Sequence, residues 1–279
     1  MKTGIFTSEE GKNEILGFYE RMLEKWPVEY MESDIPTSFG NTHVIISGPA
    51  DSPPLVLLHG STSNATTWAG DISYYSQHFR VYAPDMPGEP GKSSENRLSW
   101  ENDDYPYWLS QLLDGLGIGK TSIAGLSLGG WAAMKFAASF PGRTGKIALI
   151  APGGIVDPRL GAIFRLIRYQ RMGKDGVERT IRMLFPDDFE SPEVREFFSL
   201  LGRFFIARKE PLKKLEDSAI SRITAPVLMV CGAKDAIFNF RKAEKRLKKL
   251  LPEAETLLFE KGTHGLVSMA DTIIPFLKS

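Results

Sequence analysis

The sequence predicts an α/β protein with a mostly parallel, doubly wound sheet and an inserted helical segment. Strand-like apolar runs alternate with helical patterns along most of the chain, as they do in sheets covered by helices on both faces. The run at 55–59 is continuously apolar up to its last residue, which is typical of a strand buried on both sides. Between 153 and 222 the helical patterns continue without any strand, which predicts an insertion.

The elements are expected in the following order. An amphipathic helix at 13–26, ended by Pro27, is interpreted as packing on the outside of the domain. A hairpin follows, with Ser38 and Phe39 before a turn at Gly40 and Asn41 and a strand at 42–47. The strands of the main sheet are predicted at 55–59, 80–84, 121–126, 146–150, 227–231 and 254–259. The helices between them are predicted at 66–78, 103–116, 130–140 and 241–251, with a C-terminal helix from about Ser268.

The organisation predicted from these elements is one core interrupted by a cap. The core comprises 1–152 and 223–279, and the helical cap comprises 153–222. The cap is rich in aromatic residues, most of which should pack within the cap and core while the others line an apolar pocket. The aromatic residues of the cap are Phe164, Tyr169, Phe185, Phe189, Phe197, Phe198, Phe204 and Phe205.

Composition excludes several classes of function. Lys+Arg and Asp+Glu both number 34, so bulk charge gives no reason to expect a nucleic-acid or membrane-surface partner. Cys231 is the only cysteine; it lies in an apolar run and is interpreted as a small buried hydrophobe. The first ten residues contain no apolar stretch, and no run is long enough to span a bilayer. We therefore expect a cytoplasmic protein.

Ser127 is the most informative residue of the chain. It lies in the pattern Gly125-Leu126-Ser127-Leu128-Gly129, directly after the strand predicted at 121–126. A G-x-S-x-G pattern between a strand and a helix predicts a strained turn that exposes a nucleophilic serine, and its glycines avoid collisions with neighbouring backbone.

A nucleophilic serine needs a histidine as base and a carboxylate that orients the histidine. Of the four histidines, His264 lies on a loop after the strand at 254–259, at the sheet edge where ligands bind in open α/β folds. Asp235 is the first carboxylate after the strand at 227–231, and Asp157 is the alternative acid. The order Ser127, Asp235, His264 along the chain is that of α/β-hydrolases.

The oxyanion of an acyl-transfer intermediate needs two backbone donors. The amide of Leu128, after the nucleophile, is predicted to be one. The amide of Ser61, in the loop that follows the first central strand, is predicted to be the other, with His59 as a structural residue. Trp131 and Thr62 are candidates for the substrate pocket, although Trp131 could instead serve helix packing.

No cofactor or metal is expected. The segment 88–93 ends in Gly-Lys-Ser, but a P-loop needs glycine where Met86 stands. The glycines at 115–119 follow a helix rather than a strand, unlike those of a dinucleotide-binding turn. No cluster of His, Cys and Asp has metal-ligand spacing.

Taken together, these stretches resemble the α/β-hydrolase superfamily. The matching stretches are 59–61, 85–88, 125–129, 232–235 and 262–265. The segments 39–49 and 53–60, the helix end Trp26-Pro27 and the elbow at 125–130 resemble bacterial carboxylesterases of the naproxen-esterase type. The loop at 88–91 is one residue longer than the common form. The resemblance implies a cofactor-free serine hydrolase with a helical cap.

The function expected is hydrolysis of small or medium carboxylic esters through an acyl-enzyme on Ser127. With the same three residues, the alternatives are a C–C bond hydrolase, a lactonase, a peptidase, or a hydrolase-fold ligand sensor with slow turnover. The partner is a small-molecule ester, and the sequence leaves monomer and homodimer open.

Overall fold

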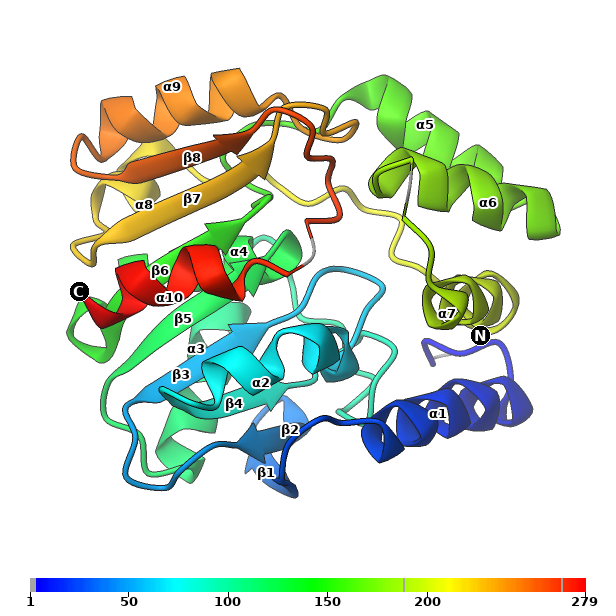
Figure 1. Cartoon of the computed structure of the whole chain (residues 1–279), viewed down its shortest axis with the longest axis horizontal. Helices are drawn as coiled ribbons and strands as arrows, with labels where there is room; N and C mark the ends of the chain where they lie inside the picture. Colours follow the sequence, from blue (N-terminus) through cyan, green and yellow to red (C-terminus); the bar gives the residue numbers. More distant parts are fainter. Residues whose placement is uncertain (1–3, 188, 267) are drawn as a thin grey trace.

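The computed structural model describes residues 4–187, 189–266 and 268–279. Residues 1–3, part of the segment expected to lack an apolar leader, lie outside the described residues. Figure 1 shows a central sheet with helices on both faces and a group of helices, α5, α6 and α7, beyond one end of the strands.

Within the described residues the sheet has eight strands in the order β1-β2-β4-β3-β5-β6-β7-β8. The strands β1 and β2 form an antiparallel hairpin, β2 pairs antiparallel with β4, and the strands from β4 to β8 pair in parallel. Their bounds are Tyr30–Thr37, Gly40–Ser47, Pro54–Leu58, Arg80–Pro84, Thr121–Leu126, Thr144–Ile150, Val227–Gly232 and Glu255–Phe259 for β1 to β8. The fold class predicted from the sequence is therefore confirmed.

Two apolar layers cover the sheet. On one face, the helices α3 (Asp104–Gly115), α4 (Leu128–Ser139), α8 (Asp217–Ser221) and α9 (Phe240–Leu250) contribute to one core cluster. On the other face, the last turns of α1 (Glu9–Glu24), the 3-10 helix η1 (Ala65–Gly70), α2 (Ile72–Tyr75) and α10 (Ala270–Lys278) contribute to a second. A short 3-10 turn, η2, covers Pro141–Arg143.

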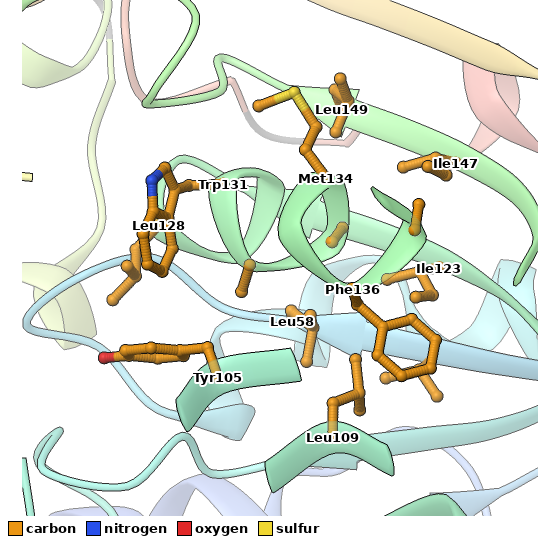
Figure 2. Packing of buried hydrophobic residues seen from close by; sticks show 14 of the residues in the cluster. Leu58, Tyr105, Leu109, Ile123, Leu128, Trp131, Met134, Phe136, Ile147 and Leu149 are labelled. Carbon is orange, nitrogen blue, oxygen red and sulfur yellow. The ribbon is translucent and has the colours of Figure 1, made fainter. Parts of the chain in front are cut away.

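The helix α4 is almost wholly apolar and begins directly after Ser127. Figure 2 shows Leu128, Trp131, Met134 and Phe136 of α4 packed with Leu58 and other residues of the sheet. The four α4 side chains are fully buried. Burial of this size stabilises a helix by about 1.5–3 kcal/mol for each large side chain, so α4 is a rigid base for the turn that precedes it.

Several boundaries differ from those expected. The first helix starts at Glu9 rather than residue 13, because Ser8 caps it by accepting the Gly11 amide. The hairpin turn lies at Ser38 and Phe39, and Gly40 already begins β2. In place of one helix at 66–78 there are η1 and the four-residue α2.

The segment between β6 and β7 contains helices and, in its described part, no strand of the sheet. The helices are α5 (Leu160–Tyr169), α6 (Gly173–Leu184), α7 (Pro192–Phe204) and α8. Ile220 of α8 is fully buried in the core cluster beside α4, whereas α5, α6 and α7 lie apart from the sheet (Figure 1).

The N-terminal segment packs on α7 rather than on the sheet alone. Ile5 and Thr7 exchange backbone hydrogen bonds with Ile206 and Phe204, which follow or end α7. Phe18 of α1 stacks on a phenylalanine of α7, with ring centroids 5.2 Å apart. These contacts form a small separate core that joins α1 to the inserted helices.

Candidate active site

Ser127 occupies the turn between β5 and α4 with a backbone φ of 50°. This left-handed conformation is uncommon for a residue with a side chain. Neither glycine of the turn can be replaced by a larger residue without a clash: a Cβ at Gly129 would overlap the Leu58 carbonyl, and one at Gly125 would overlap the Gly129 backbone. The Ser127 amide donates to the Ile150 carbonyl on β6 (2.9 Å). The strained turn expected from the G-x-S-x-G pattern is thus present.

The structure brings three of the predicted side chains into one line. The Ser127 Oγ lies 3.1 Å from His264 Nε2, and His264 Nδ1 lies 2.8 Å from Asp235 Oδ2. The three residues come from three loops at the carboxyl ends of β5, β7 and β8. These strands are parallel, so their ends meet at one edge of the sheet, which is where such folds bind ligands.

Asp235 is held firmly. Its side chain is 4% exposed, and its Oδ1 accepts the backbone amides of Ile237 (2.6 Å) and Phe238 (3.0 Å). Burial raises the pKa of the carboxyl, but the hydrogen bond and charge of His264 and the two amides outweigh it, so the pKa lies below its usual value. The carboxylate therefore stays ionised and keeps Oδ2 available to the imidazole.

The His264 loop is fixed from two sides. A Cβ at Gly232 would overlap the backbone of Gly262, so the loops after β7 and β8 are in direct contact. On the other side the Gly265 amide donates to the carbonyl of Leu184, at the end of α6. The Phe238 ring lies 5.7 Å from the imidazole. The base is thus supported by both the sheet and the inserted helices.

The expected oxyanion donors lie next to Ser127. A Cβ at Gly60 would come within 3.7 Å of the Ser127 Cβ, which places the turn before Ser61 beside the nucleophile. Leu128 is the first residue of α4, and first-turn amides of a helix lack an intrahelical acceptor. The amides of Ser61 and Leu128 therefore remain the predicted oxyanion donors.

A second loop, at 85–93, supports the loop that carries Ser61. Asp85 accepts the Ala65 amide with one oxygen and the Lys92 amide with the other, both at 2.7 Å. His59 is fully buried, and its Nε2 accepts the Met86 amide (2.8 Å). Burial lowers the pKa of His59, so it remains neutral, and its expected structural role is confirmed.

Glu89 is a residue that sequence reasoning missed. It is 6% exposed, and its Oε2 accepts the amide of Thr62 at 2.6 Å. Burial raises its pKa to about 7, although that amide and the charges of Arg97 and Arg208 oppose the rise. The only signal in the sequence was the extra residue in the loop at 88–91, which did not indicate a contact with Thr62.

The two pocket candidates have other contacts. Trp131 is fully buried between Trp100 and Tyr105, with ring centroids 5.3 and 5.1 Å away, and its indole N–H donates to the Lys213 carbonyl. These contacts correct the pocket assignment to a packing role, because the ring is enclosed by other side chains. Thr62 has a φ of 54°, and its hydroxyl donates to the neighbouring Ser61 carbonyl, so it shapes the loop.

The alternative acid and the remaining histidines lie elsewhere. Asp157 is exposed and pairs with Lys214 rather than with His264. His43 is buried in β2, and its ring nitrogens contact Glu32 and Asp34. His78 contacts Lys278 near the C-terminus.

Among residues 4–187, 189–266 and 268–279, no three His, Cys, Asp or Glu side chains gather in a way that could hold a metal ion. None of the helices in those ranges is both long and apolar enough to cross a bilayer.

Comparison with known sequences gives matches along most of the chain. Residues 55–273 match the model of the "Alpha/beta hydrolase family". The chain is 30% identical over 256 residues to the uncharacterized carboxylesterase nap of Bacillus subtilis strain 168, covering 89% of this chain and 85% of that protein. It is 39% identical over 218 residues to a 2-hydroxy-6-oxononadienedioate/2-hydroxy-6-oxononatrienedioate hydrolase of Burkholderia vietnamiensis, covering 76% and 68%.

Comparison with solved structures gives equally extensive matches. Carboxylesterase CesB (YbfK) from Bacillus subtilis superposes with a TM-score of 0.87 at 25% identity. Naproxen esterase (carboxylesterase NP) from Bacillus subtilis superposes with a TM-score of 0.87 at 26% identity. Each alignment covers 96% of this chain and 98% of the other.

Proposed function

Because the chain belongs to the α/β-hydrolase family, we propose that it is a serine carboxylesterase that cleaves small or medium carboxylic esters through an acyl-enzyme on Ser127. The matches to Bacillus subtilis carboxylesterases confirm the predicted resemblance to the naproxen-esterase type. The observation that carries the proposal is the hydrogen-bonded line from Asp235 through His264 to Ser127.

The first chemical step is acylation. Ser127 Oγ attacks the ester carbon while His264 Nε2, 3.1 Å away, accepts the hydroxyl proton. Asp235 holds the Nδ1 proton on the opposite side of the ring, which selects the tautomer with a free Nε2 and stabilises the imidazolium. The amides of Ser61 and Leu128 donate to the oxyanion.

Acylation ends when His264 returns its proton to the leaving alcohol oxygen and the C–O bond breaks. Deacylation repeats the same steps with water: His264 takes a proton from a water molecule that attacks the acyl carbon, and gives that proton back to Ser127 as the acid leaves. No step calls on a cofactor, since the protein's own groups move every proton.

We propose that α5, α6 and α7 form a cap over this site within the insertion at 153–222. The Gly265–Leu184 hydrogen bond, which links the cap to the His264 loop, supports this. The burial of Ile220 among core residues argues that the last part of the insertion, from Glu216, belongs structurally to the core.

The experiment that tests the proposal combines turnover and labelling. The wild-type protein should hydrolyse p-nitrophenyl butyrate with multiple turnovers, and Ser127→Ala should lower kcat by at least about a thousandfold. A fluorophosphonate should label Ser127, as located by peptide mapping. Turnover within tenfold of wild type in Ser127→Ala, or labelling elsewhere, would refute the assignment. A single burst without further turnover would instead favour a ligand sensor.

C–C bond hydrolysis is a second candidate, favoured by the 39% identity to the Burkholderia vietnamiensis hydrolase. The same three side chains could serve it. An assay with a 2-hydroxy-6-oxo-dienoate alongside the ester separates the two: the carboxylesterase proposal requires a higher kcat/KM for the ester.

A further inference from the structure

A large groove lies against the loops that carry Asp235 and His264. Its volume is about 910 Å³, within the range of small-molecule sites. On the core side it is lined by Lys234 and Ala236, which flank Asp235, and by Lys261 and Thr263, of which Thr263 precedes His264. The cap side is lined by residues of α5, α6 and the turn after α6: Arg165, Tyr169, Asp175, Glu178, Arg179, Arg182, Met183, Phe185, Pro186 and Asp187.

The side chains that line this groove carry a net positive charge. Its lining contains five cations, Arg165, Arg179, Arg182, Lys234 and Lys261, and three carboxylates. In the part of the chain that the structure describes, none of the five cations has an ion-pair partner within 4 Å. One of the three carboxylates, Glu178, is already paired with Arg195 of α7, which does not line the groove. Guanidinium and ammonium groups free of protein partners are the groups that proteins use to bind carboxylates and phosphates.

The floor of the groove carries a second, independent feature. Thr263 is 9% exposed, and its hydroxyl has no hydrogen-bond partner among the described residues. Buried hydroxyls normally have a partner, and one without it is a candidate for a ligand contact. Thr263 precedes His264 in the chain, so the groove reaches the loop that carries the base.

The end of the groove near His264 is apolar. Phe185 lies against Gly265, where a Cβ would come within 2.6 Å of its ring, and stacks on Phe189 with centroids 4.2 Å apart. A chain of a few methylenes could therefore lie along Phe185 and Met183 while a charged end reaches the arginines of α6. A groove that is apolar at the His264 loop and cationic along α6 suits an ester with an anionic group several bonds from the reacting carbonyl.

From these features we propose that the groove is a subsite for a carboxylate or phosphate group carried by the ester substrate. Arg179 and Arg182 supply the charge from α6, Lys261 supplies it from the core, and the Thr263 hydroxyl donates to the bound group. The inference rests on the proposed esterase function, since it names the substrate class of that site. The anion could belong to the acyl or to the alcohol part, because the groove borders the loop of the base that serves both.

The test compares esters that differ only in charge. On the acyl side the pair is p-nitrophenyl hydrogen adipate and p-nitrophenyl hexanoate. On the alcohol side the pair is the butyryl ester of 3-hydroxypropanoate and propyl butyrate. We expect a higher kcat/KM for the anionic member of at least one pair. In Arg179→Met/Arg182→Met the anionic-to-neutral ratio should fall by roughly fivefold or more, given the usual value of an exposed charge pair.

The matched control is Arg168→Met/Lys174→Met, which removes two cations from α5 and α6 that do not line the groove. It should leave the ratio at the wild-type value. An equal fall in both double variants would mean that only the general field of the cap attracts anions, and an unchanged ratio in the groove variant would overturn the subsite.

Binding separates this inference from the esterase proposal. Calorimetry on Ser127→Ala with both pairs of esters measures affinity without turnover. If the wild-type protein hydrolyses both members of each pair but has a higher kcat/KM for the neutral ester, the subsite is refuted and the esterase proposal stands. If it hydrolyses neither member, the esterase fails, and tighter binding of the anionic ester, lost in the groove variant, would still support the subsite. Equal affinities within both pairs would refute it.

Discussion

At Asp235 the two carboxylate oxygens have separate tasks. Oδ1 accepts two backbone amides of the following turn, whereas Oδ2 faces the imidazole. This division explains why a carboxylate that is almost fully buried can remain ionised, because hydrogen bonds to the charged form repay its desolvation. It also orients the side chain before any substrate binds, which is what a fixed tautomer of His264 requires.

The role of Asp235 gives the first prediction. Asp235→Asn should lower kcat by about ten-thousandfold, because an amide does not stabilise the imidazolium and can hold the wrong tautomer. Asp157→Asn is the control and should change kcat less than twofold, since Asp157 is exposed and pairs with Lys214. Steady-state kinetics with p-nitrophenyl butyrate measures both. Similar losses in the two variants would contradict the geometry.

Glu89 gives a prediction about stability and pH. Its pKa is about 7 in the folded protein and near the ordinary glutamate value of 4.5 in the unfolded protein. Between these values the folded state binds the extra proton, so the free energy of unfolding falls as pH rises from about 4.5 to 7. The fall due to this group is about 3 kcal/mol at 1.36 kcal/mol per unit.

Glu89→Gln should remove that dependence while its amide oxygen can still accept the Thr62 amide. Urea unfolding at pH 5 and pH 8 is the measurement: the variant should gain stability relative to wild type at pH 8 but not at pH 5. Parallel pH profiles for the two proteins would show that the carboxyl is already accommodated as an anion.

Sequence order was sufficient to predict which serine, aspartate and histidine come together, because parallel strands deliver their carboxyl ends to one edge. It was not sufficient for Glu89 or for Trp131. The contact between Glu89 and Thr62 joins two loops 27 residues apart, and no local pattern encodes it. Trp131 follows the elbow closely, yet helical rotation turns its ring into the α3–α4 core.

At the scale of elements, the approach of α4 to β3 determines the geometry of the site. The Cα of Gly129 lies so near the Leu58 carbonyl that no side chain fits between them. Any larger residue would push the start of α4 away from the sheet and carry Ser127 and the Leu128 amide with it. Element boundaries depend on similar contacts, such as the Ser8 cap that starts α1 earlier than apolar periodicity indicated.

Gly129→Ala should therefore destabilise the protein by several kcal/mol and reduce activity beyond the loss of folded protein, because overlap with backbone cannot be relieved by a rotamer change. Gly202→Ala is the matched control: it lies in α7, where a Cβ meets nothing within 4 Å. That variant should gain about 0.5–1 kcal/mol. Chemical denaturation of both, with activity per folded molecule, checks the pair. Equal stability of the two would contradict the close approach.

At the scale of the whole molecule, the N-terminal segment joins α7 to the body of the protein. In Figure 1 α1 runs beside α7, and the two share a small core that includes Ile15, Phe18 and Leu201. The sequence correctly predicted an amphipathic helix here but placed it only on the outside of the domain. The helix that α1 packs against, α7, begins only at Pro192, so periodicity alone could not reveal this contact. The contacts that join the inserted helices to the rest of the protein thus include those of α1 with α7 and the Gly265–Leu184 hydrogen bond.

This attachment leads to the last prediction. Phe18→Ala should leave the sheet folded but loosen α7, because it removes a ring that is 5% exposed and stacked on Phe197. Hydrogen exchange should show protection in α7 falling by one to two orders of magnitude while β3 and β5 keep theirs, as expected for local opening. Glu14→Ala, on the exposed side of the same helix, should change neither. Because α7 packs on α6, KM for an ester should rise more than kcat falls. A uniform loss of protection across the sheet would instead show that α1 stabilises the core as a whole and is not a specific anchor for α7.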